Sequence, residues 1–251
     1  PDDHLVAVPD GHGGFGIGET LAEARAVAGK VQGRRTTVSP RAPLDLPPGD
    51  WAATLRTPWV EPAYLETDAA WGVPGGEPSS PLANGGAFGG KSDPFALEFI
   101  VSALAFKTSR PVKMLWTREE VFYAHRGRHP MHMHYRTGAD RNGRLCGVDA
   151  RILIDGGAYS SFGLVTTYYS GQLLTGPYDF PNYRFDSTRV FTNKPPCGPK
   201  RGHGSVQPRF AFEVQLDELA ERVGLDGIEI RRVNFQGGDT MTVNGQRITS
   251  N

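Results

Sequence analysis

Two alternating segments around a polar turn constrain the fold more than any other feature of this sequence. Apolar and polar residues alternate over 131–137 and over 145–154, and Asp140-Arg141-Asn142-Gly143 lies between the two segments. Alternation with a period of two indicates strands with one buried face, and an Asn-Gly pair favours a tight turn. The sequence therefore predicts a β-hairpin over 131–154.

Three histidines lie at the beginning of this hairpin. His132 and His134 share one face of the expected strand, opposite Met131 and Met133. Together with His129 they suggest a metal site, but no carboxylate partner is evident. We therefore favour a polar strand face for these histidines.

Helices are interleaved with further extended segments. Pro208 opens an amphipathic helix that runs to Gly224, and a further helix is capped by Asp226. A helix capped by Ser92 or Asp93 is apolar nearly all round as far as Phe106, so we expect it to be buried. Extended structure or a strand is expected over 51–71, 112–116 and 181–192, and residues 117–120 begin a helix. This irregular mixture predicts the α+β class.

The first fifty residues differ from the rest. Residues 18–28 resemble a helix with Thr20 as its cap and Gly29 at its end. Residues 33–49 are rich in Arg, Thr, Ser and Pro, which is typical of a linker. The sequence therefore predicts two parts, residues 1–50 and residues 51–251.

Charge and cysteine content exclude several classes of function. Lys and Arg number 27 and Asp and Glu also number 27, so the net charge gives no reason to expect nucleic acid or an anionic membrane as a partner. No apolar run approaches the ~20 residues needed to span a bilayer. Cys146 and Cys197 are far apart and lack CxxC spacing, so they cannot build a zinc or iron–sulfur site. A reduced, cytoplasmic protein is expected.

Two glycine-rich loops, residues 85–91 and 198–205, each precede a predicted helix. Glycine lacks a Cβ atom, so the backbone can approach a ligand closely. The following helix N-terminus adds a partial positive charge that suits an anion. With Lys91 and Arg201 attached, the two loops favour an anionic ligand, while the alternative is that the glycines only form tight turns.

The first loop also satisfies the spacing of a nucleotide-binding P-loop. Gly85 is followed by four residues and then by Gly90-Lys91-Ser92. A P-loop follows a buried strand of continuous apolar residues, whereas residues 75–84 are rich in Gly, Pro and Ser. A P-loop nucleotide-binding protein therefore stays an alternative, and it predicts saturable binding of a magnesium nucleotide.

Gly85-Gly86-Ala87-Phe88-Gly89-Gly90-Lys91 resembles the Gly-Gly-x-Phe-Gly-Gly-Lys loop in the large subunit of molybdenum hydroxylases, the xanthine dehydrogenase/aldehyde oxidase family. The resemblance is continuous from about Ala83 to the C-terminus. Further matches follow in the same order: Arg110–Lys113, Thr117–Glu120, Asp155–Tyr159, Gly176–Asn182, Phe191–Pro196, Arg201–Gly204, Phe210–Leu225 and Ile230–Phe235. Such an ordered series is highly specific.

The resemblance implies the fold of the first molybdenum-cofactor-binding domain, preceded by the tail of an α/β hammerhead domain. It also implies a molybdenum–molybdopterin cofactor, in mononucleotide or cytosine dinucleotide form, with no protein side chain bonded to the metal. Arg201 and Phe88 would lie next to the reacting centre. The residues implied to contact the cofactor are Gly86, Ala87, Phe88, Gly89, Gly90, Arg201, Gly202, His203 and Gly204.

By the same resemblance, the chain is part of an oxidoreductase that hydroxylates or reductively dehydroxylates an aromatic, heteroaromatic or aldehyde carbon. Iron–sulfur clusters and FAD would be carried by partner subunits, and the rest of the molybdenum subunit would be a further partner. Residues 199–204 look nearer to the 4-hydroxybenzoyl-CoA reductase branch, which implies a small aromatic or CoA-thioester substrate.

Two departures from the family pattern support a second alternative. The family's catalytic base is a Glu in a late Gly-x-Gly-Glu motif; Gly16-Ile17-Gly18-Glu19 imitates this motif in another place. The connection over 71–84 also looks shorter than in the family. A degenerate or truncated paralogue without catalytic activity is therefore an alternative, and we expect the chain alone to expose apolar surface and self-associate.

Overall fold

The computed structural model describes residues 6–9, 15–18, 31–38, 51–75, 86–92, 94 and 96–249. Its centre is a five-stranded sheet in the order β3-β9-β8-β7-β4, formed by β3 (Val31–Val38), β4 (Trp51–Thr57), β7 (Met131–Ala139), β8 (Leu145–Asp155) and β9 (Asn182–Val190). Only β8 and β9 run parallel within this sheet. The parallel pair needs a crossover, and helix α4 (Gly163–Gln172) lies in that connection.

The β7–β8 pair confirms the predicted hairpin. Its turn is closed by the backbone N–H of Gly143, which donates to the Asp140 carbonyl at 3.0 Å. Met131 and Met133 are fully buried, whereas His132 is half-buried and His134 is exposed. The sheet therefore has one face in the core and one polar face, as the alternation indicates.

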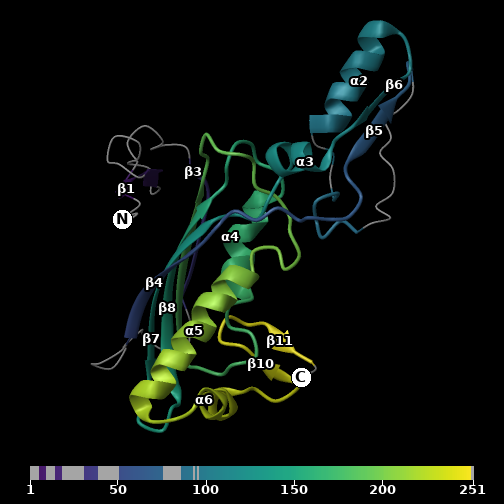
Figure 1. Cartoon of the computed structure of the whole chain (residues 1–251). Helices are drawn as coiled ribbons and strands as arrows, with labels where there is room; N and C mark the ends of the chain where they lie inside the picture. The colour runs from purple at the N-terminus through teal and green to yellow at the C-terminus, as the bar shows by residue number, and fades with distance from the viewer. Residues whose placement is uncertain are drawn as a thin grey trace.

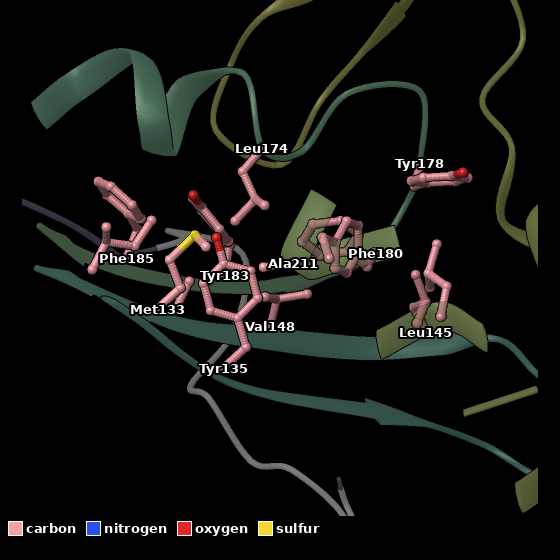
Figure 2. Packing of buried hydrophobic residues seen from close by; sticks show 14 of the residues in the cluster. Met133, Tyr135, Leu145, Val148, Leu174, Tyr178, Phe180, Tyr183, Phe185 and Ala211 are labelled. Carbon is pink, nitrogen blue, oxygen red and sulfur yellow. The ribbon is translucent and has the colours of Figure 1, made fainter. Parts of the chain in front are cut away.

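Helices α4 and α5 (Val206–Val223) pack on the buried face of the sheet, and α6 (Gly227–Asn234) packs on α5 (Figure 1). The core between them is rich in aromatic side chains; Figure 2 shows Tyr183, Phe185 and Phe180 among its residues. Phe212 and Leu216 of α5 are buried in it, as the helical pattern predicts. Asp226 accepts hydrogen bonds from the backbone of Ile228 and Glu229, which confirms the predicted cap of α6.

A second, smaller lobe lies beyond one end of the sheet (Figure 1). Helix α2 (Ala96–Thr108) packs on the two-stranded sheet of β5 (Ala69–Gly72) and β6 (Val112–Leu115), and helix α3 (Arg118–Ala124) follows. Thr117 and Glu120 form a capping box at the start of α3, which confirms the predicted helix start. A separate apolar cluster holds this lobe together, formed by Tyr64, Ala70, Leu97, Val101, Trp116 and Val121.

The remaining elements are short. Strands β1 (Val6–Pro9) and β2 (Phe15–Gly18) pair with each other, as do β10 (Thr240–Met241) and β11 (Arg247–Ile248). No helix of the described ranges is long and apolar enough to cross a membrane. Both cysteines are free thiols, and Cys197 is buried.

Two sequence-based expectations need correction. Residues 33–38 are not linker: they belong to β3, which pairs antiparallel with β9 at the edge of the central sheet. Helix α2 is not buried all round, because only Leu97, Val101 and Ala105 of its residues are buried. The helix predicted over 18–28 lies outside the described residues beyond Gly18, so that element and the boundary near residue 50 stay predictions.

The outer side of α2 carries large apolar side chains that no described residue covers. Phe99 is 67% exposed and Phe106 is 87% exposed. Trp71 and Leu115 are also exposed, on the face of the small sheet that points away from the helix. Large exposed apolar side chains on two sides of this lobe favour an interface or a site of association.

We therefore expect the chain expressed alone to self-associate through the small lobe. The double change Phe99→Glu with Phe106→Glu should shift the population toward monomer, because charged side chains resist burial. Light scattering coupled to size-exclusion chromatography measures this shift, with the exposed pair Arg136→Glu and Arg184→Glu on the main sheet as control. A monodisperse wild-type monomer would contradict the prediction.

Candidate functional site

The two glycine-rich loops are in direct backbone contact. The N–H of Arg201 donates to the carbonyl oxygen of Phe88 at 2.7 Å. A Cβ atom at Gly89 would lie 2.9 Å from the carbonyl carbon of Pro199, closer than real Cβ atoms approach. Gly89 also has φ = +98°, so glycine is required here both by conformation and by space.

The first loop rests on the small lobe. A Cβ atom at Gly90 would lie 2.7 Å from the Tyr64 ring and 3.0 Å from the His125 ring, so the backbone is pressed against both side chains. His125 is buried, and its Nε2 lies 3.6 Å from a carboxylate oxygen of Asp68, which also accepts a hydrogen bond from the Tyr64 hydroxyl. Lys91 Nζ lies 4.5 Å above the Tyr64 ring and donates to the Glu66 carbonyl at 3.0 Å.

The position of Lys91 bears on the P-loop alternative. A P-loop lysine reaches back toward the phosphates that its own glycine-rich loop holds. Lys91 instead reaches the segment before β5 and holds the loop against it. The contacts of Lys91 therefore do not favour nucleotide binding.

Phe88 has a left-handed backbone with φ = +48°, a conformation that costs a non-glycine residue about 1–3 kcal/mol. Its side chain is 44% exposed, so the core does not require the aromatic ring. A large apolar side chain held outward on a strained loop is available to contact a ligand.

The second loop continues from a bridge beside the first. Residues Gly127 and Cys197 form a parallel β-bridge, and the N–H of Gly198 donates to the Gly127 carbonyl at 2.9 Å. Gly202 (φ = +74°) and Gly204 (φ = +77°) then turn the chain into the first turn of α5. A Cβ atom at Gly204 would lie 3.0 Å from Tyr169 on α4, so the loop lies directly on that helix.

Arg201 and His203 project from this loop in different surroundings. The Arg201 side chain is exposed, and its guanidinium has no hydrogen bond or ion pair to the described residues. His203 is half-buried, with Nε2 3.2 Å from the Phe162 carbonyl and its ring 5.7 Å from that of His129. The structure thus gathers the predicted residues of both loops around the contact of Phe88 with Arg201.

Sequence reasoning missed the side chains behind the two loops. Arg126 is buried, and its Nη2 donates to the Gly90 carbonyl at 2.9 Å while Nη1 donates to the Ser161 hydroxyl at 3.0 Å. Arg128 Nη2 donates to the Arg201 carbonyl at 2.5 Å. The Arg-Gly-Arg-His run over 126–129 carried no recognised motif, because its partners are backbone carbonyls.

The site surroundings are rich in cationic groups. Burial lowers the pKa of the Arg128 guanidinium from its ordinary value, and burial with the nearby charge of Arg128 lowers the pKa of Lys200. Glu61 is a nearby buried carboxyl, and burial raises its pKa. Within the described ranges, no group of three or more His, Cys, Asp or Glu side chains is placed to hold a metal ion. The chemistry of the site therefore suits an anionic ligand.

Replacing Gly89 by alanine tests the contact between the loops. Gly89→Ala should destabilise the chain by more than Gly75→Ala, because Gly75 shares the positive φ but has no atom within 4 Å of its added Cβ. The conformational part costs each variant about 1–2 kcal/mol, and only Gly89→Ala adds the clash with Pro199. Urea unfolding of both variants measures the difference, and equal free energies of unfolding would contradict the predicted clash.

Two histidines with lowered pKa values predict that the fold loses stability in acid. Burial, with the nearby charge of Arg189, lowers the pKa of His129 well below its ordinary value, and burial lowers the pKa of His132 to about 4. Histidines of the unfolded chain titrate near about 6.5. The unfolded state therefore binds more protons as the pH falls below that value, and the free energy of unfolding should decrease from pH 6.5 toward pH 4.

His129→Gln should reduce this pH dependence. The control is His134→Gln, the same replacement at an exposed position nearby in the sequence. Urea unfolding at a series of pH values measures the slope. A slope that is the same in wild type and His129→Gln would show that His129 does not contribute to it.

Comparison with known proteins supports the resemblance seen in the sequence. The family model of the molybdopterin cofactor-binding domain matches residues 81–235. The chain is 41% identical over 158 residues to a probable xanthine dehydrogenase subunit of Bacillus subtilis, covering 63% of this chain and 21% of that protein. It is 39% identical over 162 residues to the nicotinate dehydrogenase large molybdopterin subunit of Eubacterium barkeri, covering 64% of this chain and 38% of that protein.

The fold agrees as well. The aldehyde oxidoreductase structure from Desulfovibrio desulfuricans superposes with a TM-score of 0.81 at 23% identity, covering 92% of this chain and 31% of that one. The chain thus spans between about a fifth and two fifths of the length of these curated relatives. The match over residues 81–235 includes both glycine-rich loops and the Arg-Gly-Arg-His segment behind them, and by it the chain belongs to the molybdopterin cofactor-binding domain family.

Proposed function

We propose that this chain forms one wall of the molybdenum-cofactor site in a larger oxidoreductase. The single observation that carries the proposal is the backbone hydrogen bond from Arg201 to Phe88, which joins the two loops of the family match into one surface. The complete enzyme would hydroxylate or reductively dehydroxylate an aromatic, heteroaromatic or aldehyde carbon. Relatives named as xanthine dehydrogenase and nicotinate dehydrogenase subunits support a heteroaromatic substrate class.

The residues of the site fit a molybdopterin group. Molybdopterin is an anionic group, and the exposed guanidinium of Arg201, which follows Lys200 in the sequence, suits an anion. Gly89 and Gly90 let the backbone of the first loop lie directly against Pro199 and against the Tyr64 and His125 rings, and this packing would fix the loop surface that faces the cofactor. When bound, the molybdenum cofactor supplies the two-electron redox chemistry.

The chain's own residues would orient the reactants. The backbone N–H groups of residues 86–89 and 202–204 are fixed dipoles that can face the cofactor, whereas the Gly90 N–H donates to the Ala87 carbonyl within the loop. Ala87 leaves this approach open by its small size. The exposed ring of Phe88 would form a wall for a planar substrate. His203, anchored at the Phe162 carbonyl, would border the cofactor from the second loop.

The proposed partners follow from the short span of the chain relative to its relatives. The remaining part of the molybdenum subunit would provide the second wall and the glutamate base. Iron–sulfur and FAD subunits would accept the electrons, and the complex would be cytoplasmic. The exposed apolar side of α2 is a surface that such a neighbour would cover.

Elemental analysis tests the proposal. The chain purified from its native host, with whatever co-purifies, should contain near-stoichiometric molybdenum together with an iron-carrying polypeptide. Arg201→Met should lower the molybdenum content, whereas Arg151→Met on the outer face of the sheet should not, because Arg151 pairs with Asp149 away from both loops. A folded wild-type protein without molybdenum would contradict the proposal and favour a non-catalytic paralogue.

A further inference from the structure

One arginine holds the second glycine-rich loop from behind. Arg128 Nη2 donates to the Arg201 carbonyl at 2.5 Å, and Nη1 lies 3.4 Å from both the Gly202 carbonyl and the Gln207 amide oxygen. Gln207 in turn donates from Nε2 to the His129 carbonyl at 2.9 Å, and both Gln207 and His129 are buried. The network thus joins the strand-entry segment, the loop and the first turn of α5.

The acceptors around Arg128 are all neutral. Within the described residues no carboxylate forms an ion pair with its guanidinium, although the side chain is only half-exposed. A half-buried arginine is usually paired with an acidic group, because desolvating an unpaired cation is costly. Here the compensation comes from backbone and amide oxygens, so the guanidinium fixes peptide groups and keeps its full positive charge next to the loop.

The Arg201 carbonyl depends on this contact more than the Gly202 carbonyl does. The Gly202 carbonyl also accepts from the Ser205 N–H at 3.1 Å and from the Ser205 hydroxyl at 3.2 Å, whereas among the described residues the Arg201 carbonyl accepts from Arg128 alone. Two successive carbonyls bound by one planar fork fix the orientation of the peptide between Arg201 and Gly202. The same peptide plane sets where the Arg201 side chain leaves the backbone and where the Gly202 N–H points.

We propose that Arg128 is a positioning residue of the site: by binding the Arg201 and Gly202 carbonyls, it aims Arg201 and the loop N–H groups at the anionic cofactor. The proposal rests on the proposed function for the identity of that ligand. The contact of Arg128 with the loop does not depend on which ligand binds. Arg128 touches neither substrate nor cofactor in this role.

A matched set of variants separates geometry from charge. Arg128→Lys keeps the charge but replaces the planar fork by a single ammonium. Arg128→Met removes both. Arg231→Met is the control, because Arg231 donates to Glu213 and Asp217 between α5 and α6 and lies on other elements. Each variant is made in the full chain.

Hydrogen exchange of the backbone amides is the first measurement and requires no molybdenum. Exchange over 199–206 should become about tenfold to a hundredfold faster in Arg128→Met, the range expected for losing hydrogen bonds from a charged donor. Arg128→Lys should give an intermediate rate. Arg231→Met should accelerate exchange at the α5–α6 contact and leave 199–206 unchanged.

Three outcomes overturn the positioning role: unchanged loop exchange in Arg128→Met, full recovery of the wild-type rate in Arg128→Lys, or equal acceleration of the loop in Arg231→Met. If Arg128→Met does not fold, Arg128→Lys alone decides, because a wild-type rate in it excludes the need for a fork.

Molybdenum content of the protein from its native host is the second measurement. Arg128→Met should retain several-fold less molybdenum than Arg231→Met, with Arg128→Lys in between. Equal retention in all variants, with a molybdenum-loaded wild type, overturns the positioning role and leaves the proposed function standing. A wild type without molybdenum overturns the proposed function and the role toward the cofactor together, while loop exchange still decides whether Arg128 holds the loop.

Discussion

The candidate site depends on a backbone contact between two segments that are distant in sequence. The Arg201 N–H meets the Phe88 carbonyl at 2.7 Å, and Gly89 lies against the Pro199 carbonyl at a separation that no other residue type tolerates. Side chains that flank this contact point outward, as Phe88 and Arg201 do. A hydrogen bond between main chains is therefore what joins the two glycine-rich loops into one surface.

The segment over 126–129 supports that contact from behind. Arg126 binds the carbonyl of Gly90 in the first loop, Arg128 binds that of Arg201 in the second, and Gly127 between them pairs with Cys197. A Cβ atom at Gly127 would lie 2.1 Å from the Trp59 ring, so this backbone is closely packed on its other side too. Arginine side chains that bind neutral carbonyls fix the backbone geometry of the loops, and their positive charge is not neutralised. An anionic ligand would be stabilised by the fixed geometry and by the charge.

The sequence predicted those helices and strands that are specified by local residue patterns. Alternation and the Asn-Gly turn predicted β7 and β8, and Thr117 and Asp226 predicted the helix starts that they cap. Helix α4 was missed because its β-branched, Tyr, Ser and Gly residues have weak helix propensity. Tertiary contacts stabilise it instead, since the Ser187 hydroxyl on β9 donates to its Thr167 carbonyl at 2.5 Å.

The same distinction between local patterns and tertiary contacts explains which residues of the candidate site the sequence revealed. Glycines and Arg201 were visible because they match a family motif, whereas Arg126 and Arg128 bind backbone oxygens, which every residue carries and no pattern marks. Strand β3 was mistaken for a linker for a related reason: Gly, Arg and Thr in this segment pair through the main chain with β9. A single sequence gives almost no indication of an interaction whose partner is a backbone atom.

The two loops rest on different apolar clusters, so the stability of each cluster affects a different part of the site. The first loop rests on Tyr64 in the small cluster, whereas the second enters α5, which is anchored in the large one through Phe212 and Leu216. The small cluster has six buried members and an apolar helix face without cover in the described residues. Because a smaller core opens at lower free energy, the position of Phe88 relative to Arg201 is limited by the stability of the small lobe. A neighbour that covers α2 would therefore also tighten the geometry of the site, although it touches neither loop.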